Sequence, residues 1–169
     1  MDDCKIENVV GALALALSDS LHDGTQAQAP EPGPAAAAIA LLGHEPGLAI
    51  EQLRRALRLS HPGTVRLVDR LTADGLVERR TSVADRRAVA LHLTRDGKVS
   101  FAAILTARRT SIADKLKLLS RSERETLGRL AEKVLSGLIH DTDGAYQVCR
   151  LCDRRSCDAC PVEHALEPE

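Results

Sequence analysis

Apolar side chains recur every three or four positions over most of the chain, a pattern typical of amphipathic helices. One such stripe ends near Gly24, a short apolar run covers residues 35–42, and two longer stripes follow position 94. The first stripe consists of Ile6, Val9, Val10, Leu13, Leu17 and Leu21. Strand-like alternation of apolar and other residues is clear only around residues 88–94. The pattern therefore predicts a mainly α fold with a small β element.

Two short helices are predicted at the centre of the chain. In the first, Ile50, Leu53 and Leu57 fall on one side of a helix. In the second, Ser60 occupies an N-cap position, and Gly75 follows the last apolar residue as a C-terminal stop. Only a short connection separates the two helices, so we expect a helix-turn-helix.

The second helix has one face for the core and another for a partner. The inner face consists of Thr64, Leu67, Val68 and Leu71. On or beside the outer face lie His61, Pro62, Val65, Arg66, Asp69 and Arg70. Because the helix begins with small residues and carries arginines outward, we expect its N-terminal end to fit the major groove of DNA.

A hairpin is predicted after the two helices. Residues 76–80 and 88–94 are the predicted strands, and Asp85, Arg86 and Arg87 lie at the tip between them. Arginines at such a tip suit the minor groove of DNA or the flanking phosphates. Two helices followed by a hairpin predict a winged helix-turn-helix.

Positive charge is concentrated in this unit. Residues 51–98 contain 11 Lys and Arg against 6 Asp and Glu, a net charge of +5, whereas the whole chain has a net charge of −1. A local excess of cations favours a polyanionic partner such as double-stranded DNA. Two alternatives are that these arginines only solvate the surface of a stable domain, and that the unit is a protein-interaction module.

The sequence LSHPGTVRLVDRLTADGLVERR, followed by ADRRAVALHLTRDG, resembles the recognition helix and wing of the MarR (multiple antibiotic resistance regulator) family of transcriptional regulators. The resemblance extends over roughly residues 6–140. The DRR of the wing and the LTxxG start of the following helix are its most specific parts. The resemblance implies a winged helix-turn-helix regulator that binds DNA.

The pattern and the resemblance together give a set of DNA-contacting residues. They are Ser60, His61, Thr64, Val65, Arg66 and Arg70 on the recognition helix and Arg86 and Arg87 on the wing, with Asp85 supporting the wing. Family members often have an apolar residue followed by Thr where this chain has Thr64 followed by Val65. An isopropyl group at the second position favours contact with a thymine methyl group over a hydrogen bond.

The segments outside this unit have apolar faces but no core of their own. We expect a dimerisation helix and Pro-rich loop over residues 1–34, the winged helix-turn-helix over 35–98, dimerisation helices over 99–140 and a cysteine-rich tail over 141–169. In the resembling family, the outer helices pair with a second subunit, and two-fold symmetry presents two recognition helices to a near-palindromic operator. The resemblance thus implies a homodimeric regulator, with repression as the default and a small-molecule effector.

The composition narrows the class of protein further. With no Trp, one Tyr and one Phe, the core is aliphatic, which favours helix packing. The apolar run at residues 9–17 is too short for a membrane span, so we expect a cytoplasmic protein with no membrane partner. The sequence has no phosphate-binding loop, nucleophile elbow or HExxH pattern, so we do not expect an enzyme.

Four of the five cysteines lie within twelve positions near the end of the chain. Cys149, Cys152, Cys157 and Cys160 form two CxxC pairs separated by four residues. Two such pairs place four thiolates on one ion, so zinc in a mainly structural role is the favoured cofactor. An iron–sulfur cluster uses the same ligands. A third interpretation is a redox-sensing regulator with metal-free thiols.

The surroundings of the cysteines suggest a link to regulation. Arg150, Arg154 and Arg155 favour thiolate formation nearby. Because the tail directly follows the predicted dimerisation helices, a change in its ligation or redox state would alter the spacing of the recognition helices. The alternative is that the tail only stabilises the C-terminal end.

Overall fold

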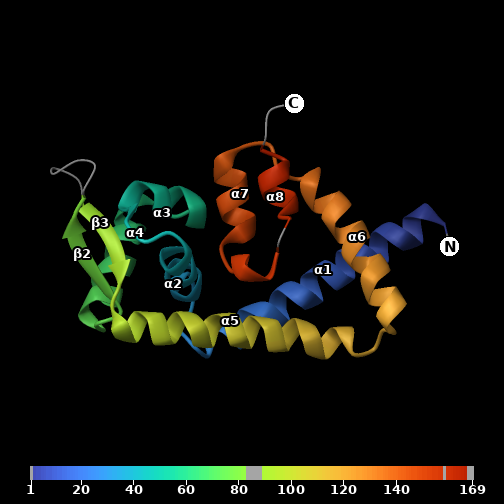
Figure 1. The fold of residues 1–169 in the computed structure, drawn as a ribbon, viewed down its shortest axis with the longest axis horizontal. Helices are drawn as coiled ribbons and strands as arrows, with labels where there is room; N and C mark the ends of the chain where they lie inside the picture. The colour runs from blue at the N-terminus through green and yellow to red at the C-terminus, as the bar shows by residue number, and fades with distance from the viewer. Residues whose placement is uncertain (1, 83–88, 158, 167–169) are drawn as a thin grey trace.

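The computed structural model describes residues 2–82, 89–157 and 159–166 (Figure 1). Its helices are α1 (Asp3–Gln26), α2 (Ala35–His44), α3 (Ile50–Leu57), α4 (His61–Ala73), α5 (Arg95–Leu116), α6 (Arg121–Ser136), α7 (Thr142–Cys149), the 3₁₀ helix η1 (Arg154–Ser156) and α8 (Pro161–His164). The strands β1 (Leu48–Ala49), β2 (Val77–Thr81) and β3 (Val89–Leu93) form one antiparallel sheet in the order β1-β3-β2. The mainly helical fold with a small β element is confirmed.

Helices α2, α3 and α4 and the sheet form a head, which we define as residues 35–93. Ile39, Leu53, Leu67 and Leu91 are fully buried in its core. Strand β1 pairs Leu48 with Leu91 and adds a third strand that the sequence did not predict. Two residues are too few to show the alternation by which a strand is recognised.

Polar caps start the helices where the sequence predicts them. The Ser60 hydroxyl accepts a hydrogen bond from Gly63 N at 3.2 Å at the start of α4. Thr94 Oγ1 accepts from Gly97 N at 3.0 Å at the start of α5 and donates to Gly75 O at 2.6 Å. The second contact ties the end of the helix-turn-helix to the first turn of α5.

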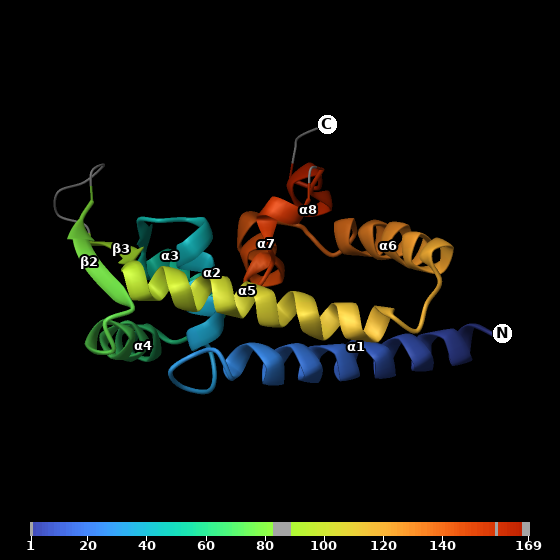
Figure 2. The same ribbon diagram turned by 60° about the horizontal axis from the view of Figure 1, so that its bottom comes forward.

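Helix α5 runs from the head along the length of the molecule (Figure 1). Helix α1 lies beside it, and α6 folds back from its far end (Figure 2). The hydroxyl oxygens of Ser20 on α1 and Ser111 on α5 are 2.8 Å apart, which fixes the two helices against each other. The head therefore sits at one end of a frame made by α1 and α5.

Helices α1 and α6 expose much of their predicted apolar stripes. No residue of α6, all of which are described, is buried. The exposed side chains are Ile6, Val9, Val10 and Leu13 on α1 and Leu127, Leu130 and Val134 on α6. In the described part of the chain, no helix has both the length and the apolar character needed to cross a membrane. The exposed stripes are thus faces that no described part of this chain covers.

The cysteine-rich tail folds into short helices that lie between the head and α6 (Figures 1 and 2). Helix α7 packs against α3, and α8 packs against α6. Ile139, Ala145, Cys149 and Val162 form a second small core there. The sequence did not predict helices in this tail, because segments of four to eight residues are too short to show helical periodicity.

Gly97 shows why the LTxxG start of α5 requires a glycine. A Cβ atom at this position would lie 2.0 Å from Leu76 O, and this oxygen belongs to a backbone that is already fixed by Thr94. We expect Gly97→Ala to lower the free energy of unfolding by about 1–3 kcal/mol, the usual cost of overpacking. Thermal denaturation at fixed protein concentration measures the change.

Gly128 on α6 provides the matched control, because a Cβ there meets nothing within 4 Å. Gly128→Ala is expected to leave stability unchanged or to raise it by about 0.5–1 kcal/mol, since alanine is the better helix former. Equal melting temperatures for wild type and Gly97→Ala would contradict the close approach of α5 to Leu76.

Candidate nucleic-acid interface and cysteine-lined cavity

Helix α4 presents a polar outer face from its first residue. Ser60, His61, Arg66 and Arg70 are all exposed, whereas Leu67 on the inner face is fully buried. Arg66 makes no ion pair with any described residue. A guanidinium that is not ion-paired with a carboxylate can bind a phosphate or a base edge without first breaking an ion pair.

Thr64 is a correction to the predicted DNA-contacting set. Its side chain is fully buried, and its hydroxyl donates to Ser60 O at 3.1 Å. The sequence pattern assigns Thr64 to the inner face of the helix, whereas its small size suits a DNA contact at the start of the helix. The burial of its side chain shows that it belongs to the inner face. Val65 is half-buried and remains at the edge of the outer face.

Arg70 has a partner that sequence reasoning missed. Its Nε atom lies 2.6 Å from Oε2 of Glu31, which belongs to the Pro-rich loop before α2. The other carboxylate oxygen, Oε1, is buried without a hydrogen-bond partner among the described residues. The loop thus supplies a negative charge beside the recognition helix. No local pattern signals this contact, because the two residues are far apart in sequence.

The wing is described only up to its base. The predicted contacts Arg86 and Arg87 and the predicted support Asp85 lie outside the described residues. On β2, Arg79 is exposed and its Nη2 atom lies 2.6 Å from Oδ1 of Asp69 on α4. This ion pair joins strand β2, at the base of the wing, to the recognition helix.

This arrangement of three helices and a β-hairpin defines a winged helix-turn-helix protein. Residues 32–88 match the model of the MarR family. The structure resembles that of MarR from Escherichia coli, with a TM-score of 0.60 and 22% identity, over 74% of this chain and 96% of that one. The fold is therefore that of the MarR-type winged-helix proteins.

Two further proteins are similar to this chain in structure or in sequence. The repressor CouR, solved with a 23-mer DNA duplex, is similar with a TM-score of 0.57 and 24% identity over 75% of this chain and 89% of that one. The transcriptional repressor MprA of Escherichia coli is 32% identical over 87 residues, 52% of this chain and 49% of MprA. The chain spans about half the length of the curated relatives it matches. Both of the curated relatives cited here are described as transcriptional regulators.

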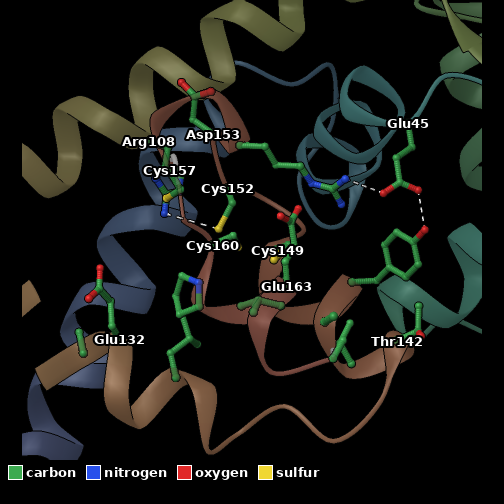
Figure 3. A pocket seen from close by; sticks show the side chains of 18 of the residues that line it. Glu45, Arg108, Glu132, Thr142, Cys149, Cys152, Asp153, Cys157, Cys160 and Glu163 are labelled. Atoms are coloured by element: carbon green, nitrogen blue, oxygen red, sulfur yellow. Dashed lines mark hydrogen bonds and ion pairs between the residues drawn. The ribbon is translucent and has the colours of Figure 1, made fainter. Parts of the chain in front are cut away.

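The four cysteines of the tail line one cavity of about 510 Å³ (Figure 3). Cys149 is buried, Cys152 and Cys160 are half-buried, and Cys157 is exposed. The cavity also contains Arg108, whose Nη2 atom lies 4.0 Å from the Cys152 sulfur. All four cysteines therefore lie at one cavity, while their service as one ligand set stays a prediction. Arg108 of α5 is an additional cation there that the sequence did not identify.

The thiols of the first CxxC pair differ in acidity. A hydrogen bond from the Cys149 thiol, together with the charges of Arg108 and Arg154, lowers the pKa of Cys152 to about 6. The same hydrogen bond and burial raise the pKa of Cys149 far above its ordinary value. The pair therefore holds one proton between two sulfurs near neutral pH, with the thiolate on Cys152.

A closed metal site is not formed in this arrangement. Among the described residues, no group of three or more His, Cys, Asp or Glu side chains is placed to hold a metal ion. The cofactor expected from the sequence, zinc or an iron–sulfur cluster, therefore stays a prediction. The chemistry of the four ligands fits a thiophilic ion, but the sulfurs would have to move closer together.

The tail is attached to the end of α2 by polar contacts. His44 Nε2 donates to Cys152 O at 2.6 Å, and burial lowers the pKa of His44. Glu45 accepts from the Tyr146 hydroxyl at 2.5 Å and pairs with Arg154 at 2.7 Å. The cysteine-lined cavity is therefore connected directly to the head.

The lowered pKa of Cys152 gives a measurable prediction. In reduced, chelator-treated protein, the rate of alkylation of Cys152 should be half-maximal near pH 6. Cys149→Ala removes the largest stabilising contact of the thiolate, so the midpoint should move upward, towards the ordinary thiol value of about 8.5. Site-resolved mass spectrometry after timed treatment with iodoacetamide follows both proteins.

Cys4 is the internal control for this experiment. It is an exposed thiol on α1, far in sequence from the cavity, and its alkylation profile should be the same in both proteins. An identical midpoint for Cys152 with and without Cys149 would show that the two thiols do not share a proton.

Proposed function

We propose that this chain is a MarR-type transcription regulator that binds double-stranded DNA through α4 and the wing and acts as a repressor. The observation that carries the proposal is the exposed N-terminal face of α4, where Arg66 makes no ion pair with any described residue, on a segment (51–98) with a net charge of +5. Helices of this kind enter the major groove with their N-terminal residues towards the bases. The arginines also supply the phosphate contacts that hold such a protein on DNA.

The comparisons support this proposal for part of the chain. The family match at residues 32–88 covers α2, β1, α3, α4 and β2, and it therefore includes the proposed recognition helix α4. CouR is bound to a DNA duplex, and MprA is a repressor. Because these relatives are matched over only part of their length or at low identity, repression and DNA binding by the whole chain remain our proposal.

We also propose that the regulator is a homodimer. The apolar stripes of α1 and α6 are both exposed, and Leu130 and Val134 are 58% and 64% exposed. Such stripes are stable in water when a second apolar surface covers them. A two-fold pair would present two copies of α4 to a near-palindromic operator.

Arg66→Ala tests the DNA interface. If Arg66 contacts a base edge, the free energy of binding should weaken by about 1–3 kcal/mol. If Arg66 contacts only a phosphate, binding should also weaken, and its dependence on salt concentration should become smaller. The probe is a duplex selected from a random-sequence pool by the wild-type protein, and fluorescence anisotropy over a salt series gives the affinity. A winged helix that binds only proteins would select no duplex.

Arg121→Ala is the matched control for charge, because this arginine is also exposed but lies on α6, away from the head. It should bind the selected duplex like wild type. Equal affinities for Arg66→Ala and Arg121→Ala would exclude α4 as the DNA-contacting surface proposed here.

Leu130→Glu tests the dimer. A carboxylate in the apolar stripe of α6 would lose its hydration on association, so the variant should be mainly monomeric at concentrations where wild type is dimeric. Sedimentation velocity distinguishes the two states. Arg129→Glu places the same side chain outside the apolar stripe, about 100° around the helix from Leu130, and should leave the dimer intact. A monomeric wild type would refute this part of the proposal.

A further inference from the structure

We propose that Glu31 limits the affinity of the recognition helix for DNA by neutralising Arg70 on the outer face of α4. The inference rests on the proposed function, because it concerns the binding of DNA by α4. Glu31 acts through Arg70 and not through a contact of its own with DNA, so it is a positioning residue of the interface. The fixed backbone around Glu31 and the burial of its carboxylate both support this role.

The loop between α1 and α2 is fixed on both sides of Glu31. On one side, Gln28 O accepts a hydrogen bond from the Ser100 hydroxyl of α5 at 3.1 Å, and Ala29 packs against the main core. On the other side, Pro34 is the N-cap residue of α2. Glu31 itself lies directly between two prolines, which restrict its backbone. The loop lies beside α4 (Figure 2), and it therefore holds Glu31 next to the recognition helix.

The two oxygens of the Glu31 carboxylate have different surroundings. Oε2 lies 2.6 Å from Arg70 Nε, whereas Oε1 is buried and has no hydrogen-bond partner among the described residues. A buried carboxylate oxygen without a donor is costly, and a nearby positive charge offsets part of that cost. If Arg70 moved to a phosphate, the carboxylate would lose this charge. The partial burial of Glu31 therefore favours the ion pair over the release of Arg70.

Arg66 and Arg70 lie one turn apart on α4, so both are placed to meet the same stretch of DNA. Their charges differ in availability, because Arg66 makes no ion pair with any described residue, whereas Arg70 is paired with Glu31. An arginine that stays paired with a carboxylate neutralises no phosphate and releases no counterion from DNA. In the wild-type complex, Arg66 therefore contributes to the electrostatic part of DNA binding and Arg70 does not.

The position of the loop thus sets the number of cations that α4 offers to DNA. Without the Glu31 carboxylate, Arg70 is free to contact a phosphate, and the interface gains one positive charge. Displacement of the loop away from α4 would have the same effect. A residue outside the helix-turn-helix therefore controls how strongly the recognition helix binds.

Glu31→Gln tests the role of the carboxylate. The variant should bind the duplex selected by wild type about 2- to 5-fold more tightly, which corresponds to the usual strength of a partly exposed ion pair. The plot of log affinity against log salt concentration should be steeper by about 0.9, because one more phosphate is neutralised. Its advantage over wild type should therefore grow by about 3-fold when the salt concentration is lowered about fourfold. Fluorescence anisotropy over a salt series measures both quantities.

Glu31→Gln/Arg70→Gln distinguishes a neutralised Arg70 from an Arg70 that contacts DNA in the wild-type complex. The double variant loses both charges of one ion pair and keeps the net charge, so its affinity and its salt dependence should equal those of wild type. Arg70→Gln alone should bind more weakly than wild type, because the Glu31 carboxylate then lies beside α4 without its cation. Thermal denaturation shows that each variant is folded at the temperature of the binding assay.

Glu125→Gln is the matched control, because it neutralises a carboxylate that is ion-paired with Arg121 on α6, away from the head. This variant should bind the duplex like wild type. Two results would overturn the inference and leave the proposed function intact. They are equal or weaker binding by Glu31→Gln, and weaker binding with a smaller salt dependence in the double variant. Wild-type protein that selects no duplex would overturn the proposed function and the inference with it.

Discussion

The burial of residues 35–42 of helix α2 is the constraint on which the rest of the structure depends. Every residue from Ala35 to Leu42 is at most 7% exposed. A helix that is apolar on all sides must be covered on all sides, and α1, α3, α5 and strand β3 cover it. Most of its side chains are alanines, which are small enough to let these neighbours approach closely. The head and the long helices are thereby one packed unit.

The C-terminal end of this buried helix is also where the tail docks. His44 and Glu45 follow directly on the last buried residues of α2, and they hold Cys152 O, the Tyr146 hydroxyl and the Arg154 guanidinium. Polar groups removed from water need hydrogen-bond partners. A tail that moved away would leave the imidazole of His44 without its carbonyl partner, so core, head and tail are coupled at this point.

Local interactions made much of the fold predictable from the sequence. The caps at Ser60, Thr94 and Ser120 depend on residues three positions away, and helical periodicity reports which face is buried. The spacing of the cysteines predicted one shared metal site; the structure places all four at one cavity, but they form no metal-holding group among the described residues. Contacts between distant segments have no such signal. The pairing of Arg70 with Glu31 and the approach of Arg108 to Cys152 depend on how distant segments pack in the tertiary structure.

The head is connected to α6 by two routes with different mechanical properties. One is the continuous helix α5, which can only bend, and the other is the chain of non-covalent contacts through α7 and α8. A ligand in the cysteine-lined cavity acts on the second route, and it can shift the head only by as much as it binds one position better than another. Such coupling is reciprocal, so if α4 binds DNA as proposed, DNA would change the affinity of the cavity for that ligand by the same factor. A ligand of a tail that merely stabilised the C-terminal end would bind with the same affinity whether or not α4 is engaged.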